Sequence, residues 1–254
     1  MPDTTVQGRS WTVEGTRAVL RNGVGGRIDV AHPEDGLCSV TIDKHRLTGQ
    51  LLRTHSNGYD RFVWPLPVAD SYVRGTDLVA SYQPSADWPY SPQIYWRANA
   101  LESIDGLIGS LSLLVSVQTH LLETHPQVAV TTHLEADEVW QLMPGSDNCI
   151  QVGRNEIHAA YPTSPGMYCV LVRLTHLPVS YCEFMRSSDF NALDVANDGT
   201  GSYRINWALF GEFLEKGVIR RARAFSAFLP RTNDLELAAA CCDMLKLDSL
   251  PLTT

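Results

Sequence analysis

The residues best suited to bind a ligand lie together in the first half of the chain, between Tyr59 and Arg97. This stretch mixes aromatic rings with arginine and aspartate side chains. Aromatic rings bury a large area at a low cost in side-chain entropy, and tyrosine and tryptophan keep a polar group that needs a partner. The mixture suits a hydrated groove, and sugars fit it because their C–H faces stack on rings while their hydroxyls need donors and acceptors. The predicted ligand-binding residues are Arg61, Trp64, Asp70, Arg74, Trp88, Tyr90, Tyr95, Trp96 and Arg97. The alternative is that these rings fill the core and staple loops.

Acid–base chemistry on a sugar needs a proton donor and a proton acceptor on opposite sides of the ligand. The candidate catalytic residues are Glu123, His125, His133 and Glu183, which lie near expected strand ends. Their spacing does not select a pair, and the alternative is that the histidines are structural. The segment HLLETH lacks the helical i, i+4 spacing of a zinc motif, so we expect no metal and no cofactor.

A short basic run near the end of the chain is a candidate anion site. Arg221 and Arg223 would share one face of a strand, where their guanidinium groups could hold a phosphate or carboxylate. The alternative is a solvated face that pairs with Glu212 and Glu215.

Composition limits the classes of protein to which the chain can belong. The chain has 254 residues, of which 44% are hydrophobic and 19% charged, as in an ordinary folded protein. Its net charge of −8 argues against non-specific nucleic-acid binding. The polar start of the sequence leads us to expect no secretory signal, and the apolar run Leu107–Val117 is too short to span a membrane. Six scattered cysteines without a CxxC pair favour reduced thiols. We therefore expect a cytoplasmic protein with no nucleic-acid or membrane partner.

The elements that must position these residues are mostly strands. Residues 111–117 place leucine and valine on one face at a period of two, which predicts a strand with one packed face. In residues 91–101, Ile94 and Trp96 would lie on one face of a strand and Tyr95 and Arg97 on the other. Turn signals such as Asn22-Gly23 separate many strands, which is an antiparallel pattern.

Only the end of the chain has a helical pattern, at about residues 233–247. The predicted fold class is mainly β, an antiparallel sandwich or supersandwich with one C-terminal helix. Residues 1–254 are expected to form a single β-rich domain. The apolar stripe Leu235, Ala238, Ala239 and Cys242 could dock the helix on the same sheet or on a second copy, so a homo-oligomer is possible.

The layout resembles the galactose mutarotase-like, or aldose epimerase-like, β-supersandwich. The resemblance rests on the turn at residues 22–28, the aromatic region 61–97 and the long central antiparallel strands. It implies a concave sheet that binds a sugar and, in active epimerases, a histidine acid with a carboxylate base. The Asn-His-x-Tyr-Phe-Asn-Leu segment that carries the acid is absent from this sequence, as is a clear counterpart of the late glutamate. Residues 70–84 and 214–230 also look like parts of a bacterial protein family.

Three functions follow as hypotheses. The first is a carbohydrate-binding or sugar-modifying protein; if it is an enzyme, it is a sugar epimerase or mutarotase-like isomerase. The alternative is a non-enzymatic interaction or scaffold protein that forms a homo-oligomer. The third is an enzyme that holds a phosphosugar ligand with Arg221 and Arg223.

Overall fold

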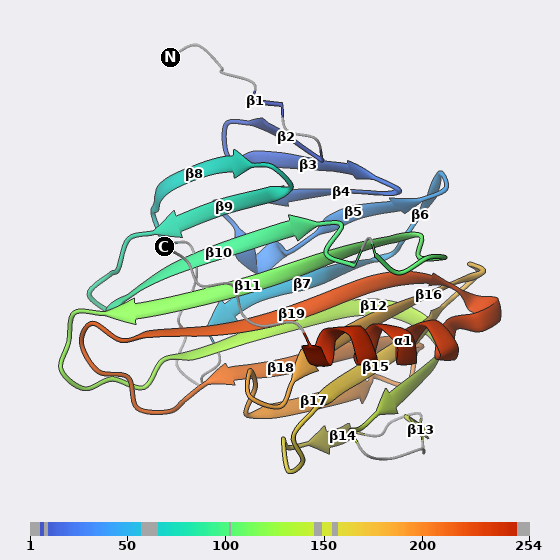
Figure 1. The fold of residues 1–254 in the computed structure, drawn as a ribbon. Coiled ribbons are helices and arrows are strands. Elements are labelled where there is room, and N and C mark those ends of the chain that lie inside the picture. Colours follow the sequence, from blue (N-terminus) through green and yellow to red (C-terminus); the bar gives the residue numbers. More distant parts are fainter. Residues whose placement is uncertain are drawn as a thin grey trace.

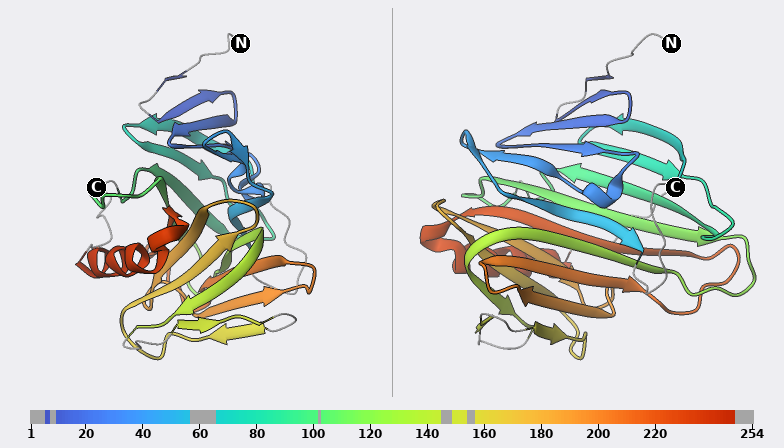
Figure 2. Two further views of the ribbon diagram at one scale, coloured as in Figure 1. Left: turned by 90° about the vertical axis from the view of Figure 1, so that its right-hand side faces the viewer. Right: turned by 180° about the vertical axis from the view of Figure 1, so that it is seen from behind.

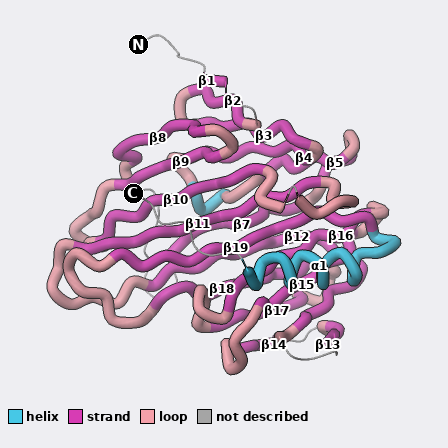
Figure 3. Tube along the Cα trace, viewed as in Figure 1, coloured by secondary structure: helices cyan, strands magenta, loops and turns pink. Residues whose placement is uncertain are grey.

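Antiparallel strands make up most of the molecule, as the ribbon and the coloured trace show (Figure 1; Figure 3). The structure is a computed structural model that describes residues 6–7, 10–56, 66–101, 103–144, 149–153 and 157–247. Within these residues, α1 (Asp234–Leu247) is the sole α-helix, and it lies near the end of the chain. Two short 3-10 helices lie at Pro33–Asp35 and Arg231–Asn233. The predicted fold class, a mainly antiparallel β protein with one C-terminal helix, is confirmed.

The first sheet follows chain order through short hairpins. Its strands in the described residues are β1 (Val6–Gln7), β2 (Trp11–Glu14), β3 (Arg17–Asn22), β4 (Val24–Asp29), β5 (Cys38–Ile42) and β6 (His45–Arg46). The predicted turn at Asn22-Gly23 joins β3 to β4. Gly23 has a φ of 64°, a left-handed conformation that glycine adopts without a steric penalty.

The second sheet is larger, and its long strands dominate Figure 1. In space its strands run in the order β14-β17-β18-β12-β15-β16-β19-β11-β10-β9-β8, and β7 and β13 also pair with β12. Their bounds are β7 (Gly49–Ser56), β8 (Val68–Arg74), β9 (Asp77–Tyr82), β10 (Tyr90–Ala98), β11 (Gly109–Thr119), β12 (Gln127–Leu142), β13 (Cys149–Gln151), β14 (Ile157–Ala160), β15 (Met167–Leu174), β16 (Val179–Arg186), β17 (Ala192–Asn197), β18 (Ser202–Phe210) and β19 (Ile219–Pro230).

Strand β12 connects the two halves of this sheet. Its first part pairs with β7 and β18, and its last part pairs with β13 and β15. The register against β15 shifts between Ala136 and Glu138, and such an irregularity bends a strand. The view from the side in Figure 2 shows the result: α1 lies on one side of the molecule, and β17 and β18 lie on the other.

The main core lies against the inner faces of these strands. Leu111, Leu113, Val115 and Val117 of β11 are all buried in it, as the period of two predicted. Inner-facing rings of other strands, Trp11, Trp207 and Tyr181 among them, join the same cluster. A second apolar cluster lies on the opposite face of β15, β16 and β19, under α1.

Helix α1 is fixed to this second face by apolar packing and by an ion-pair network. Ala238, Cys241 and Leu245 are fully buried apolar residues of the helix, whereas Leu235 and Ala239 are exposed. The packed stripe is therefore rotated from the predicted one, and it docks on the protein's own sheet. No helix in the described residues is long and apolar enough to cross a membrane.

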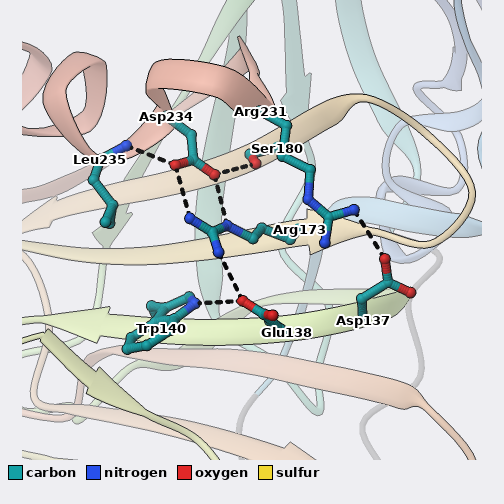
Figure 4. Close-up of polar contacts among 8 residues, drawn as sticks. All are labelled: Asp137, Glu138, Trp140, Arg173, Ser180, Arg231, Asp234 and Leu235. Atoms are coloured by element: carbon teal, nitrogen blue, oxygen red, sulfur yellow. Dashed lines mark hydrogen bonds and ion pairs between the residues drawn. The ribbon is translucent and has the colours of Figure 1, made fainter.

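The network at the start of α1 centres on Arg173 of β15 (Figure 4). Its guanidinium donates to both carboxylate oxygens of Asp234, at 2.9 and 3.2 Å, and to Glu138 at 2.8 Å. Ser180 donates to Asp234 at 2.6 Å. Burial opposes ionisation of Asp234, but the hydrogen bonds from Arg173 and Ser180 outweigh it and lower the pKa of this carboxyl. The helix start is thus held to two strands by charge-assisted hydrogen bonds.

Candidate functional site

Three of the predicted ligand-binding rings belong to the core. Trp96 has an exposed fraction of 0%, Trp88 of 6% and Tyr90 of 7%, and all three belong to the main apolar cluster. Trp96 lies on the inner face of β10 with Ile94, and Trp88 packs edge-on against Tyr90 with ring centroids 4.8 Å apart. These rings are packed in the core, as the alternative interpretation predicted, and they expose little surface to a ligand. Arg61 and Trp64 lie outside the described residues.

The other predicted ligand-binding residues share the outer face of β8, β9 and β10. Asp70 and Arg74 lie on β8, and Tyr95 and Arg97 on β10. Arg97 forms a bidentate pair with Asp77 at 2.7 and 2.9 Å, and Arg74 approaches the same carboxylate at 4.0 Å. The Tyr95 hydroxyl donates to Gln93 at 2.6 Å. These side chains do share one face, where Arg97 and Arg74 contact Asp77 and Tyr95 contacts Gln93.

Arg221 and Arg223 come to this same outer face from β19. Arg223 is only 5% exposed, its guanidinium carbon lies 4.4 Å from the centroid of the Phe225 ring, and its backbone N–H donates to Asp189 at 3.1 Å. Arg221 is near enough to Tyr95 to act on the pKa of its hydroxyl, which burial raises overall. Anion binding by this pair stays a prediction.

Glu183, one of the predicted catalytic residues, is sealed in the interior. It is 0% exposed and accepts hydrogen bonds from Tyr181 at 2.8 Å, from the Trp207 indole at 2.7 Å and from the Thr132 hydroxyl. Burial raises the pKa of Glu183, although the three donors act in the opposite direction. A carboxyl in this position cannot reach a ligand, so it ties β16 to β12 and β18 and is not a catalytic candidate.

Glu123 and His125 are exposed in the connection between β11 and β12, not in a strand. The His125 ring packs against Phe213 with centroids 5.9 Å apart. His133 lies six residues beyond the start of β12, which at about 3.3 Å per residue is roughly 20 Å along the strand. The structure therefore separates His125 from His133 and does not bring the predicted catalytic residues together.

His133 opens onto a hollow, which we call the first hollow. It has a volume of about 470 Å³, and residues of β17 and β18, which lie on the side of the molecule opposite α1 in Figure 2, form part of its lining. Three strands place its residues, because His133 on β12 lies directly opposite Arg204 on β18, which in turn lies opposite Ala196 on β17. The lining residues are His133, Ala196, Asn197, Asp198, Ser202, Tyr203 and Arg204.

The electrostatics of the first hollow favour a neutral histidine. Burial lowers the pKa of His133, and the charges of Arg53 and Arg204 and the nearby His55 lower it further. No carboxylate is among the groups that shift this pKa. At neutral pH the ring thus carries one N–H donor and one acceptor nitrogen, the pair that a hydroxyl group can use.

The lining also contains a carboxylate, and a second histidine, His55, lies on the neighbouring strand β7 outside the lining. Asp198 accepts hydrogen bonds from the backbone and hydroxyl of Thr200, at 2.8 and 2.7 Å, and these bonds lower the pKa of its carboxyl. His55 on β7 contacts Thr131 at 2.7 Å, and burial lowers the pKa of the His55 ring. The hollow therefore presents an ionised acceptor, a guanidinium donor and a neutral imidazole to a ligand.

Of the lining residues, His133 is the one that was predicted from the sequence as a site residue. The sequence of β18 could have indicated Arg204 and Ser202, because polar residues alternate there with Tyr203, Ile205 and Trp207. Such alternation indicates a polar outer face. It does not indicate that β12 and β17 place further polar groups beside it.

No family model matches this sequence, and a search of curated proteins finds no relative. Comparison with solved structures does find similar folds. A "putative aldose 1-epimerase" from Klebsiella pneumoniae superimposes with a TM-score of 0.58 and 7% identity, over 98% of this chain and 90% of that one. The protein HI1317 gives a TM-score of 0.54 and 8% identity, over 90% of this chain and 100% of that one.

The fold also occurs in a protein of different description. A TPR-domain containing protein from Parabacteroides distasonis matches with a TM-score of 0.52 and 9% identity, over 96% of this chain and 51% of that one. At such identities the comparisons establish the fold alone, and one fold can carry many functions. The resemblance to the aldose epimerase-like supersandwich is thus confirmed for the fold, and any sugar-related role has to be argued from the site.

Proposed function

We propose that the protein binds a carbohydrate in the first hollow, with His133, Arg204 and Asp198 as the principal hydrogen-bonding groups. The observation that carries the proposal is the convergence of a neutral imidazole, a guanidinium and an ionised carboxylate on one open hollow of about 470 Å³. Pockets of roughly 300–1,000 Å³ are typical of small-molecule sites. Sugar hydroxyls both donate and accept, so they can satisfy all three groups. The fold shared with a "putative aldose 1-epimerase" supports this ligand class.

This mode of binding differs from the aromatic groove predicted from the sequence. The ring in the lining, Tyr203, is only 4% exposed, so it offers little surface for stacking. Recognition would rest on hydrogen bonds. The proposal concerns binding alone and includes no epimerase or mutarotase chemistry.

The alternative hypothesis, an interaction protein that dimerises through α1, is weakened by the packing. Ala238, Cys241 and Leu245, the apolar face of the helix, are already covered by β15, β16 and β19. A homo-oligomer formed through another surface stays a prediction, which light scattering can check.

The proposal is tested by a glycan array followed by calorimetric titration of each sugar that binds. His133→Ala and Arg204→Ala are each expected to weaken binding by about tenfold or more, since each removes a hydrogen-bonding group from the ligand. His120→Ala is the matched control, because His120 is exposed in the loop after β11, away from the lining. If no sugar binds, or if the control weakens binding as much as His133→Ala, the proposal fails.

A further inference from the structure

A second polar hollow adjoins the first. It has a volume of about 220 Å³ and lies where the β5–β6 hairpin and the β15–β16 turn approach β12. The polar residues that line it are His45, Arg46, Thr48, Glu135, Thr175 and His176. None of these residues lines the first hollow, and none has a role in the site described above.

The two hollows lie beside each other along the outer face of β12. His133 lines the first hollow and Glu135 the second, and residues two apart on a strand point to the same side, about 7 Å from each other. Glu135 lies directly opposite Ser202 of β18, and Ser202 lines the first hollow. A ligand that filled the first hollow could thus continue past Ser202 and Glu135 into the second hollow.

Size indicates that the second hollow is an extension and not a separate site. Its 220 Å³ lies below the range of roughly 300–1,000 Å³ that is usual for an independent small-molecule pocket, whereas the first hollow lies within it. The combined space of the two hollows suits a ligand longer than one sugar unit.

Charge indicates that the ligand is neutral. The lining of each hollow contains one arginine and one carboxylate: Arg204 with Asp198 in the first, and Arg46 with Glu135 in the second. Because each carboxylate offsets one arginine, neither lining has a surplus of arginine charge to hold a phosphate or carboxylate ligand, whereas hydroxyl groups can donate to the carboxylates and accept from the guanidinium groups.

From these observations we infer that the ligand is a neutral oligosaccharide of at least two units, which occupies the first hollow and extends across β12 into the second. The inference rests on the proposed carbohydrate binding. It adds the length and charge of the ligand, and it assigns Glu135 and His176 to a second subsite.

Calorimetric titration with matched ligands of increasing length tests the inference. Each neutral disaccharide or trisaccharide that binds on the array is compared with its constituent monosaccharides and with glucose 6-phosphate as the anionic probe. The oligosaccharide is expected to bind about tenfold more tightly than the monosaccharide. Glu135→Gln and His176→Ala should remove this advantage without changing monosaccharide affinity, while His133→Ala should weaken both.

The outcomes separate the inference from the proposed function. If monosaccharide and oligosaccharide bind equally and the variants at Glu135 and His176 change neither, or if glucose 6-phosphate binds most tightly, the inference is overturned while carbohydrate binding stands. If no glycan binds, both fall. Thermal unfolding of each variant, with His120→Ala as the control, confirms that a loss of affinity is not a loss of fold.

Discussion

The buried carboxyl of Glu183 gives the sharpest test of how this interior is held together. One of its oxygens accepts from Thr132 and Tyr181, and the other accepts from the Trp207 indole at 2.7 Å. Glu183→Gln keeps the shape of the side chain but replaces one acceptor oxygen with a donor NH₂ group. If the amide oxygen still accepts from Thr132 and Tyr181, the NH₂ group faces the Trp207 N–H, and two donors then meet in the buried interior.

The size of the destabilisation expected for Glu183→Gln follows from the lost hydrogen bond with Trp207. A hydrogen bond to a charged group contributes about 1.5–3 kcal/mol, so Glu183→Gln should lower the free energy of unfolding by about that amount. Trp207→Phe removes the opposing donor. Trp207→Phe should therefore lower the free energy of unfolding by less in the Glu183→Gln background than in the wild type. The cavity left by the indole is the same in both, so the difference reports the hydrogen bond. The expected coupling is about 1.5–3 kcal/mol.

Urea unfolding followed by far-ultraviolet circular dichroism measures the four proteins of this cycle without relying on tryptophan fluorescence. Additivity within about 0.5 kcal/mol would refute the hydrogen-bonding role assigned to Glu183. The pH dependence provides an independent check. Burial raises the pKa of Glu183 in the folded state, so the folded protein binds the proton more tightly than the unfolded chain. The wild type should then lose stability as pH rises above about 4.3, the ordinary pKa, through the raised value, and Glu183→Gln should lack this loss.

Two further predictions concern groups whose pKa is lowered in the folded state, so that the protein loses stability as pH falls and not as it rises. Asp234→Asn should destabilise the protein by about 1.5–3 kcal/mol at neutral pH by weakening the contacts with Arg173 and Ser180. Because the folded-state pKa of Asp234 is lowered, urea titrations should show this difference vanishing as pH falls through that value; a constant difference would contradict the assignment. Burial lowers the pKa of His55, so stability should fall as pH drops below about 6.5, where the unfolded chain takes up the proton. His55→Gln should flatten the thermal-unfolding curve against pH in that range, and an unchanged slope would show that another group is responsible.

The sequence by itself determined the local structure. The alternation in residues 111–117 gave a strand with one packed face, Asn22-Gly23 gave a turn, and the end of the chain gave a helix. Each of these features depends on neighbours a few residues apart, so the pattern is visible without the fold. The alternation in β10 was also correct, with Trp96 on one face and Tyr95 on the other. Because both faces carry rings, however, the pattern could not show which one is buried.

Only the tertiary structure decided which residues meet. Trp96 is in the core because the inner face of β10 is covered by the other strands, a fact that no residue within β10 encodes. The first hollow joins His133 to Arg204, residues about seventy positions apart that become direct neighbours through the pairing of β12 with β18. Such long-range pairing is set by how the whole sheet closes around its core. The burial and the electrostatic environment of His133 therefore depend on strands that are distant in the sequence. The local sequence pattern does not show that these strands pair with β12.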